Sequence, residues 1–242
     1  MNKLIYFTLG HNPKYIQLAK LCVESIKRTG YTGDLLFITN LKKEVMDSIS
    51  FDKDPLFMDI EDRGLLFSSA HKLKIYQFHL INKYDQIIFC DLDVIWTDSP
   101  DIIFDIIEDG YVYVSTESEK MSHELWGGRI FTESEKNKID EEKTLGISAG
   151  IFGFTKSMVH HFLIIDSFLF KNLRFVNEVL EQPFLNVYLY RNNLYKNLFN
   201  EFVRHDGYHN DSKDKTVVHF AGGPGNFDLK YEKMNQFIKK IY

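Results

Sequence analysis

The chain has 242 residues, of which 44% are hydrophobic and 26% are charged. These are ordinary values for a globular protein, and the length can bury the core of one large α/β domain. This composition excludes a chain with long disordered segments, a collagen and a coiled coil. Acidic residues outnumber basic ones 34 to 29, and the net charge is −5. The chain therefore shows no sign of the basic surface that binds nucleic acid.

Cysteine usage and apolar run lengths bear on the compartment. The two cysteines, Cys22 and Cys90, form neither a disulfide framework nor a CxxC motif, which fits a reducing interior better than secretion. The apolar run Leu4–Phe7 is too short for a signal peptide. No apolar run approaches the roughly 20 residues of a membrane helix. We therefore expect a soluble, cytoplasmic protein without a membrane span.

The N-terminal part predicts a strand–helix–strand unit. Residues 4–9 form an apolar, β-rich run, and residues 35–39 form a second one. Between them, residues 14–29 place apolar side chains at helical spacing, with Asn12 suited to the N-cap and Gly30 to the C′ position. Such a unit predicts parallel strands joined by a right-handed crossover. Further expected elements up to residue 115 are helices at 41–49, 67–83 and 101–108 and strands at 55–60, 86–90 and 111–115.

The C-terminal part begins with a polar, charged segment, 116–144, which we expect to be a surface excursion or mobile loop. After it we expect a strand at 147–154, helices at 156–170, 174–190 and 228–241, and short strands within 201–220. No internal repeat or linker is present. We therefore expect one α/β domain, 1–242, whose mainly parallel central sheet is flanked by helices. Its nucleotide-binding half would span about 1–115 and its acceptor-side half about 116–242.

Two carboxylates, Asp91 and Asp93, follow the most apolar predicted strand, 86–90. In open α/β sheets, ligands bind beyond the carboxyl ends of the strands. Carboxylate oxygens there suit Mg²⁺ or Mn²⁺, which in turn bind phosphate oxygens. Asp also favours turns, so a solvated turn at a strand end is the alternative.

A histidine and a run of glycines follow another predicted strand. His219 comes directly after Thr216-Val217-Val218 and precedes the glycine-rich segment 221–225. An imidazole can complete a metal site made of two carboxylates. Glycines allow a close approach of the backbone to a phosphate. A histidine at a strand end alone is more often structural.

Taken in order, the motifs resemble those of metal-dependent glycosyltransferases with the Rossmann-like GT-A fold. Family 8, typified by glycogenin and the bacterial lipopolysaccharide galactosyltransferases, is the nearest match. The resemblance spans residues 4 to about 226. The motifs are Thr-Leu-x-x-Asn-x-x-Tyr from Thr8 to Tyr15, a lysine helix, a hydrophobic run before the DxD, a small-Ala-Gly strand, an acid-Gln-x-x-Leu-Asn segment and His-Phe-x-Gly.

The resemblance implies a role for each matching position. The expected metal ligands for Mn²⁺ or Mg²⁺ are Asp91, Asp93 and His219. The expected catalytic residues are Gln182 beneath the anomeric carbon, Glu181 beside it, and Lys74 facing the donor sugar and phosphates, with Lys72 as the alternative lysine. The expected nucleotide-sugar contacts are Thr8, Leu9, His11, Asn12, Tyr15 stacked on the base, Arg63, Lys74, Asp91, Leu92, Ser148, Ala149, Gly222 and Gly223. The structural alternative for Asn12 is a helix N-cap, and the structural alternative for the 181–186 segment is a capping device at a helix start.

The resemblance further implies a UDP-sugar donor, an acceptor hydroxyl on a glycan or glycoprotein, and transfer with retention. The sequence departs from the family at Ser148, where Asn is usual, and at Gly225, where a lysine usually grips the leaving diphosphate. That cation would then come from Lys213, Lys215 or Lys230. An inverting enzyme would instead need a carboxylate base, for which Asp206 and Glu181 are candidates. Trp126 is either a sugar-stacking residue or a buried anchor.

Two other function classes fit parts of the pattern. A haloacid-dehalogenase-type phosphatase would use Asp91 as nucleophile in the segment Asp91 to Thr97, which reads DxD-x-x-x-Thr, but its second acidic pair is missing. A non-catalytic protein that binds sugar nucleotides or glycans would fit the missing lysine at 225. The joint presence of Asp91, Asp93, Lys74, Gln182 and His219 argues against a decayed site.

Overall fold

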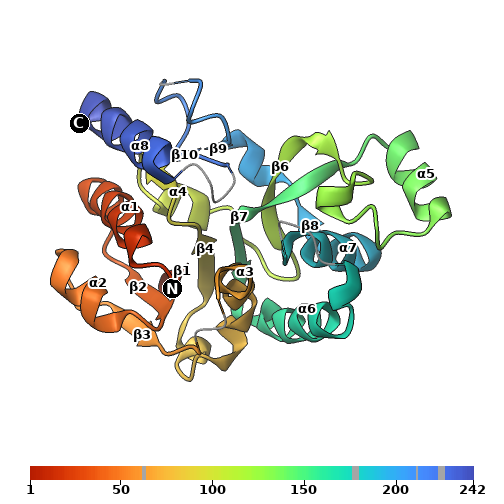
Figure 1. The fold of residues 1–242 in the computed structure, drawn as a ribbon, viewed down its shortest axis with the longest axis horizontal. Helices are drawn as coiled ribbons and strands as arrows, with labels where there is room; N and C mark the ends of the chain where they lie inside the picture. The colour runs from red at the N-terminus through yellow and green to blue at the C-terminus, as the bar shows by residue number, and fades with distance from the viewer. Residues whose placement is uncertain (62–63, 176–179, 211, 223–226) are drawn as a thin grey trace.

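A computed structural model describes residues 1–61, 64–175, 180–210, 212–222 and 227–242. At its centre lies a seven-stranded sheet with the order β3-β2-β1-β4-β7-β6-β8 (Figure 1). Only β7 runs against its neighbours, so the expected mainly parallel sheet is confirmed. The strands are β1 (Lys3–Leu9), β2 (Asp34–Thr39), β3 (Leu56–Met58), β4 (Gln86–Cys90), β6 (Val112–Lys120), β7 (Leu145–Thr155) and β8 (Tyr195–Lys196).

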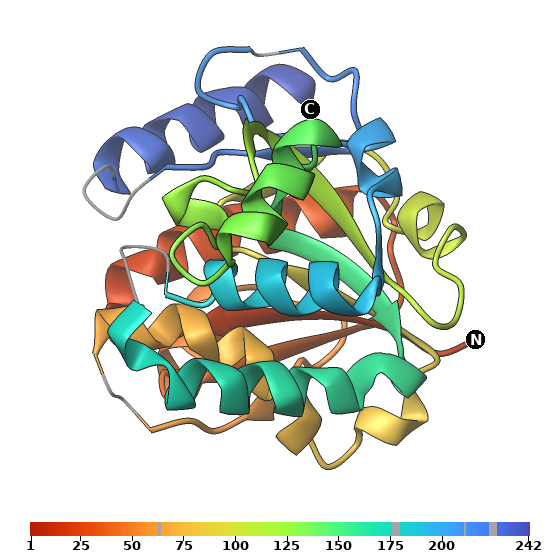
Figure 2. The same cartoon turned by 90° about the vertical axis from the view of Figure 1, so that its right-hand side faces the viewer.

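Helices cover both faces of this sheet and give the fold three layers. On one face lie α1 (Ile16–Arg28), α2 (Lys42–Ser48), α4 (Asp101–Phe104) and α8 (Phe227–Ile241); on the other lie α3 (Leu65–Ala70), α6 (Val159–Lys171) and α7 (Gln182–Asn192). Figure 2 shows α6 and α7 side by side over their face. Successive side chains of a strand point to opposite faces. Accordingly, Leu4 and Tyr6 of β1 enter one core, and Ile5 and Phe7 enter the other.

A small second sheet brings distant parts of the chain together. It has the order β5-β10-β9, with β5 (Val94–Trp96), β9 (Val203–Arg204) and β10 (Val217–His219). The antiparallel pairing of β5 with β10 sets His219 opposite Val94. The backbone N–H of Phe220 donates to the carbonyl of Asp93 at 2.8 Å. This pairing fixes His219 beside the residues that follow β4.

Several expected elements differ from the structure, and the helix expected at 101–108 already ends at Phe104 as α4. The helix expected at 67–83 divides into α3 and 3₁₀ turns at His71–Gln77 and Ile81–Lys83, with Phe78 extended so that Phe78 and Ile81 both enter the core. The helix expected at 174–190 is present as α7 from Gln182; residues 176–179 lie outside the described residues.

Of the two alternatives for 116–144, a surface excursion or a mobile loop, the mobile loop was wrong. There β6 continues to Lys120, a 3₁₀ turn covers Glu124–Trp126, and α5 covers Glu133–Glu141. Thr132 and Glu135 start α5 through a reciprocal capping box, a pattern that can be read in the sequence.

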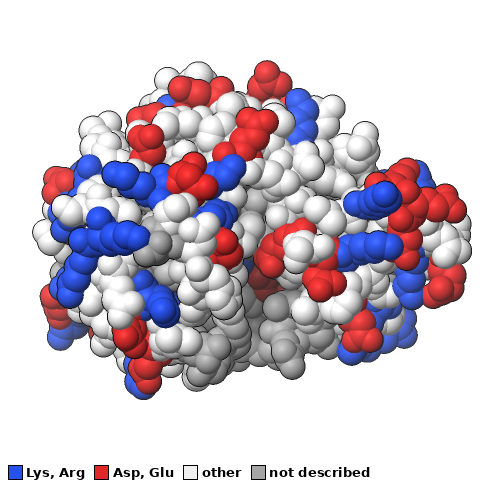
Figure 3. Space-filling model, turned by 90° about the horizontal axis from the view of Figure 1, so that it is seen from above, with Lys and Arg blue, Asp and Glu red and all other residues white. Residues whose placement is uncertain are grey.

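Two surface properties complete the description. No helix among the described residues is long and apolar enough to cross a membrane. On the face that Figure 3 shows, Lys and Arg side chains are interspersed with Asp and Glu side chains. Positive and negative charges therefore lie side by side across this face.

Candidate active site

A cavity of about 680 Å³ opens at the edge of the central sheet where β1 and β4 end. It is lined from both halves of the chain by Thr8, Leu9, Gly10, Tyr15, Leu18, Ser68, Ser69, Lys72, Asp91, Leu92, Asp93, Glu117, Leu125, Trp126, Ser148, Ala149, Gly150, Glu181, Gln182, His219, Ala221, Gly222, Phe227 and Lys230. A cavity at the carboxyl ends of parallel strands is the usual ligand site of such sheets.

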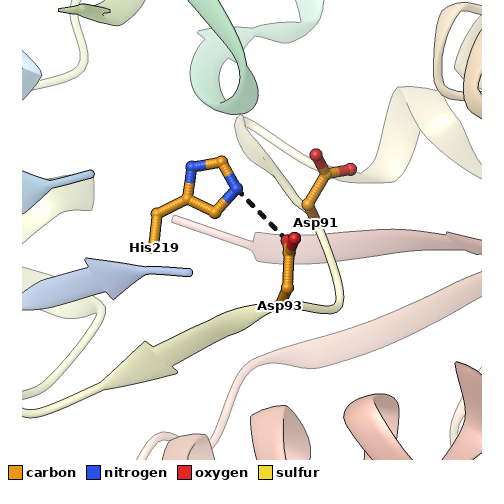
Figure 4. A group of neighbouring side chains, drawn as sticks. All are labelled: Asp91, Asp93 and His219. Atoms are coloured by element: carbon orange, nitrogen blue, oxygen red, sulfur yellow. Dashed lines mark ion pairs between the residues drawn. The ribbon is translucent and has the colours of Figure 1, made fainter. Parts of the chain in front are cut away.

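Asp91, Asp93 and His219 meet at this cavity, and one atom offered by each lies within 4.8 Å of the others (Figure 4). Asp91 follows the last residue of β4, and its N–H donates to the carbonyl of Gly150 at 2.8 Å. Asp93 directly precedes β5, and His219 ends β10. The predicted constellation is therefore assembled by the pairing of β5 with β10.

The donor set fits a divalent cation. Oδ1 of Asp93 is buried without a hydrogen-bond partner among the described residues, and Nε2 of His219 lies 3.2 Å from it, an ion pair when His219 is protonated. Two ligand atoms that face each other in this way suit a shared positive ion. Two carboxylates and one imidazole match the ligand preferences of Mn²⁺, and the carboxylates those of Mg²⁺.

The two carboxylates differ in their electrostatics. Burial is the largest influence on Asp91 and raises its pKa to about 6, against the opposing effect of Lys72. Burial acts on Asp93 in the same direction, but Lys230 and His219 outweigh it and lower the pKa of Asp93. Asp93 is therefore the carboxylate that stays ionised most firmly.

His205, which the sequence reading did not single out, orients His219. Nδ1 of His205 lies 3.0 Å from Nδ1 of His219, and Nε2 of His205 lies 2.9 Å from Oγ of Ser115. Burial, then the neighbouring His219, lowers the pKa of His205 to about 3, so His205 is neutral and can accept one hydrogen bond. If Nδ1–H of His219 donates to His205, Nε2 of His219 keeps its lone pair toward Asp93. Outer partners of this kind fix the orientation and tautomer of metal-binding histidines.

The lysine of the site is Lys72, the alternative to Lys74. Nζ of Lys72 lies 2.8 Å from Oε1 of Glu181 and 3.3 Å from Oδ1 of Asp91, and it donates to the carbonyl of Ala149 at 2.9 Å. Its side chain is 3% exposed. Lys74 is not among the residues that line the cavity, because the 3₁₀ turn turns it away from Lys72; its charge acts on Asp166 instead.

The Lys72–Glu181 pair is held as an ion pair. Burial alone would favour the neutral forms of both groups. The carboxylates of Asp91 and Glu181 nevertheless raise the pKa of Lys72, and Lys72 lowers the pKa of Glu181. The carboxylate of Glu181 is thus a fixed negative charge at one end of the cavity.

Asp91, Asp93 and His219 are called the metal-ligand cluster below, because they are the candidate ligands of an ion. A second lysine, Lys230 on α8, contacts the other side of this cluster. Its Nζ bonds Oδ2 of Asp93 and donates to the carbonyl of Gly222 at 3.1 Å. The side chain is 8% exposed. Lys230 is one of the three lysines considered from the sequence for the cation missing at 225, and neither Lys213 nor Lys215 lines the cavity.

Helix α7 fastens the amino-terminal part of β7 with two amide side chains. Oε1 of Gln182 accepts from the N–H of Ala149 at 3.2 Å. Asn186 bonds both backbone groups of Ile147, at 2.7 and 2.9 Å. These contacts place Ser148 and Ala149 on the cavity wall, where they were expected.

Gly150, the glycine of the small-Ala-Gly motif, makes room for the ring of His219. A Cβ at this position would lie 2.3 Å from Cε1 of His219. The imidazole therefore occupies the space that any larger residue at position 150 would need.

The expected nucleotide loop is divided between the cavity and the surface. Thr8, Leu9 and Tyr15 line the cavity, as do Leu92 and Gly222. His11 and Asn12 are not among its lining residues. The Oδ1 atom of Asn12 accepts from the N–H of Lys14 at 3.0 Å, which is the N-cap alternative. Arg63 and Gly223 lie outside the described residues.

Trp126 forms part of the cavity wall but is only 4% exposed. A Cβ at Gly146 would lie 2.4 Å from Cδ2 of the indole, so the ring packs directly on the backbone of β7. The buried-anchor alternative describes this packing. Glu117 of β6 and Leu125 lie on the same wall, and the sequence reading did not single them out.

Comparisons with known proteins show which fold this is. No family model and no curated protein sequence matches the chain. Among solved structures, the apo form of the bifunctional glycosyltransferase WbbM matches with a TM-score of 0.63 and 16% identity over 100% of this chain, which spans 51% of that protein. The apo form of GlyE from Streptococcus pneumoniae TIGR4 matches with a TM-score of 0.63 and 12% identity, covering 99% of this chain and 63% of that one.

A third solved structure is matched over nearly its whole length by this chain. The apo form of mouse xyloside xylosyltransferase 1 matches with a TM-score of 0.59 and 15% identity, covering 90% of this chain and 97% of that one. At these identities the likeness shows the fold alone. The α/β fold expected from the GT-A resemblance is therefore confirmed as a fold that glycosyltransferases share.

Proposed function

We propose that this protein is a metal-dependent glycosyltransferase that moves a sugar from a nucleotide-sugar, with UDP favoured, to a hydroxyl of a glycan or glycoprotein. One observation carries the proposal. The potential ligand atoms of Asp91, Asp93 and His219 converge on a large cavity at the carboxyl end of β4, in a fold shared with glycosyltransferases. Each half of that observation supports the other, since phosphate-bound donors need a cation at such a site.

Asp91, Asp93 and His219 would hold Mn²⁺ or Mg²⁺. A bound divalent ion neutralises the charge that builds on the leaving nucleoside diphosphate. The residues of this chain then supply position and shape. Thr8, Leu9 and Tyr15 form the wall on which we place the base, and Tyr15 packs edge-on against Phe227 with ring centroids 5.5 Å apart.

The sugar would lie toward Glu181 and Gln182. The reacting sugar develops positive charge, as in glycoside chemistry, and the fixed carboxylate of Glu181 favours that charge. Gln182 lines the same end of the cavity and is held by the N–H of Ala149. Lys72, rather than Lys74, keeps Glu181 in place.

We propose that transfer retains configuration. An inverting reaction needs a carboxylate that takes a proton from the acceptor. Asp206 is not among the cavity residues and pairs with Arg204 at 3.2 Å. Glu181 has a lowered pKa and is bound to Lys72, so it is a weak base. In a retaining reaction the departing phosphate itself can take the proton of the acceptor hydroxyl.

The phosphatase alternative is less well supported. It needs Thr97 beside Asp91, but Oγ1 of Thr97 donates to the carbonyl of Lys215, in the segment before β10. Thr97 is not among the cavity residues. A non-catalytic binding protein would use the same cavity, so measured sugar transfer is what separates it from the enzyme.

Calorimetric titration of nucleotide-sugars and free nucleoside diphosphates, with and without Mn²⁺, tests the proposal. We expect one base series to bind only with metal, and we expect Asp93→Asn to abolish that binding. Asp47→Asn, an exposed carboxylate on α2, is the matched control and should bind like the wild type. Absence of binding to every nucleotide in the presence of metal would overturn the glycosyltransferase assignment. The tightest nucleotide-sugar then serves as donor in transfer assays.

A further inference from the structure

The two lysines that line the described cavity are held very differently. Lys72 has the carboxylates of Asp91 and Glu181 and the carbonyl of Ala149 as partners, and the nearer carboxylate, Glu181 at 2.8 Å, lies outside the cluster proposed to bind the ion. Lys230 has one carboxylate, Oδ2 of Asp93, and the carbonyl of Gly222. That carboxylate belongs to the cluster proposed to bind the divalent ion. A divalent ion would therefore compete with Lys230 for the carboxylate of Asp93, whereas it would not compete with Lys72 for Glu181.

The charge lining the cavity is unsuited to a diphosphate as it stands. Four carboxylates, Asp91, Asp93, Glu117 and Glu181, face two lysines and His219. A nucleoside diphosphate adds further negative charge. Its binding requires cations that are not already neutralised by these carboxylates. A divalent ion is one such cation, and a lysine released from a carboxylate would be another.

The position of Lys230 suits the diphosphate. The ammonium of Lys230 contacts Asp93 of the metal-ligand cluster. It is also close enough to Tyr15 and Tyr208 for its charge to act on their hydroxyls. Gly222, its second partner, lines the cavity. In a nucleotide whose base lies beside Tyr15 and whose phosphate binds the metal, the chain of atoms between base and phosphate would pass the ammonium of Lys230.

We propose that Lys230 is a cation with two alternative partners: it neutralises Asp93 in the metal-free protein and binds the nucleoside diphosphate once a divalent ion occupies Asp93. The inference rests on the proposed function. The displaced ammonium keeps the carbonyl of Gly222 as a nearby partner.

The two halves of the inference predict opposite effects of one substitution. In Lys230→Met, Mn²⁺ alone should bind about 10-fold more tightly, because it no longer has to displace an ammonium that makes a charged hydrogen bond. With saturating Mn²⁺, the affinity for the nucleoside diphosphate of the preferred base and for inorganic pyrophosphate should fall about 10- to 100-fold. A residue with only a structural role would not shift the two affinities in opposite directions.

Lys230→Gln, which is neutral but can still donate to Asp93, repeats the test if Lys230→Met does not fold. Lys233→Met on the same helix, beside a separate cavity of about 230 Å³, is the matched control and should leave both affinities unchanged. Unaltered Mn²⁺ affinity in the folded variants would overturn the competition, and unaltered diphosphate affinity would overturn the second partner. A wild type that binds Mn²⁺ but no nucleotide would count against the proposed function, while the Mn²⁺ titrations would still decide the first half.

Discussion

Gly150→Ala should remove His219 from the proposed metal site while leaving the fold in place. The added Cβ would lie 2.3 Å from Cε1 of His219, whereas ordinary contact begins at 3.4 Å, so the ring has to move by the difference of 1.1 Å. It is confined by its 6% exposure and by the contact with His205. Metal–ligand distances tolerate only about 0.2 Å. We therefore expect Mn²⁺ affinity to fall at least 10- to 100-fold, the approximate range for losing a residue that merely orients a ligand.

Calorimetry or electron paramagnetic resonance with Mn²⁺ measures this change directly. Gly153→Ala is the matched control, because its Cβ would meet Ile107 at 2.5 Å and Phe199 at 2.8 Å in the core instead of a ligand. It should lower the melting temperature and leave Mn²⁺ affinity at the wild-type level. A folded Gly150→Ala protein with wild-type Mn²⁺ affinity would refute the reasoning.

Three further outcomes follow from the contacts. Lys72→Met leaves Glu181 buried and unpaired and should cost about 3–5 kcal/mol of unfolding free energy in urea, whereas Lys74→Met should stay within about 0.5 kcal/mol; equal costs would contradict the assignment of Lys72. His205→Phe should lower Mn²⁺ affinity about 10-fold, with the exposed His209→Phe as control. Arg191 and Thr132 lower the pKa of Glu135 to about 2, so its stabilising effect is complete above the ordinary value of 4.5 and is lost as the pH falls toward 2. The loss of stability in Glu135→Gln should accordingly shrink in unfolding experiments between pH 5 and pH 2, and a constant difference would disprove it.

The central strands were predictable because their pattern is local. Runs such as residues 4–9, 35–39 and 86–90 are apolar at consecutive positions, as strands covered on both faces are. Each lies within a few residues of its place in β1, β2 and β4. The 3₁₀ turns of 71–83 were not predictable in this way, since tertiary packing of Phe78 and Ile81 overrides a helical spacing.

The metal-ligand cluster was predictable in its members but not in its assembly. The DxD after an apolar strand and the histidine at a strand end are visible in the sequence, and the structure brings their side chains together. The short strand β5, which sets Asp93 next to His219, consists of three β-forming residues, Val94–Trp96, but so short a run does not tell which distant strand it pairs with.

The neighbours that support the cluster carry weaker signals still. Lys72 and Lys74 are two residues apart, and only the geometry of the 3₁₀ turn decides which of them faces Glu181. His205 and Lys230 reach the cluster across folds of the chain, 14 residues before His219 and 137 residues after Asp93. The charge of the two carboxylates Asp91 and Asp93 has to be balanced wherever the fold places them, so their lysine partners, Lys72 and Lys230, had to come from elements that pack over the end of β4. α8 can provide one of them because its first turn runs past Gly222 at the mouth of the cavity. Lys230, from α8 on one face of the sheet, contacts Asp93, and Lys72, from the opposite face, contacts Asp91. The candidate metal ligands at the end of β4 therefore lie between the two lysines.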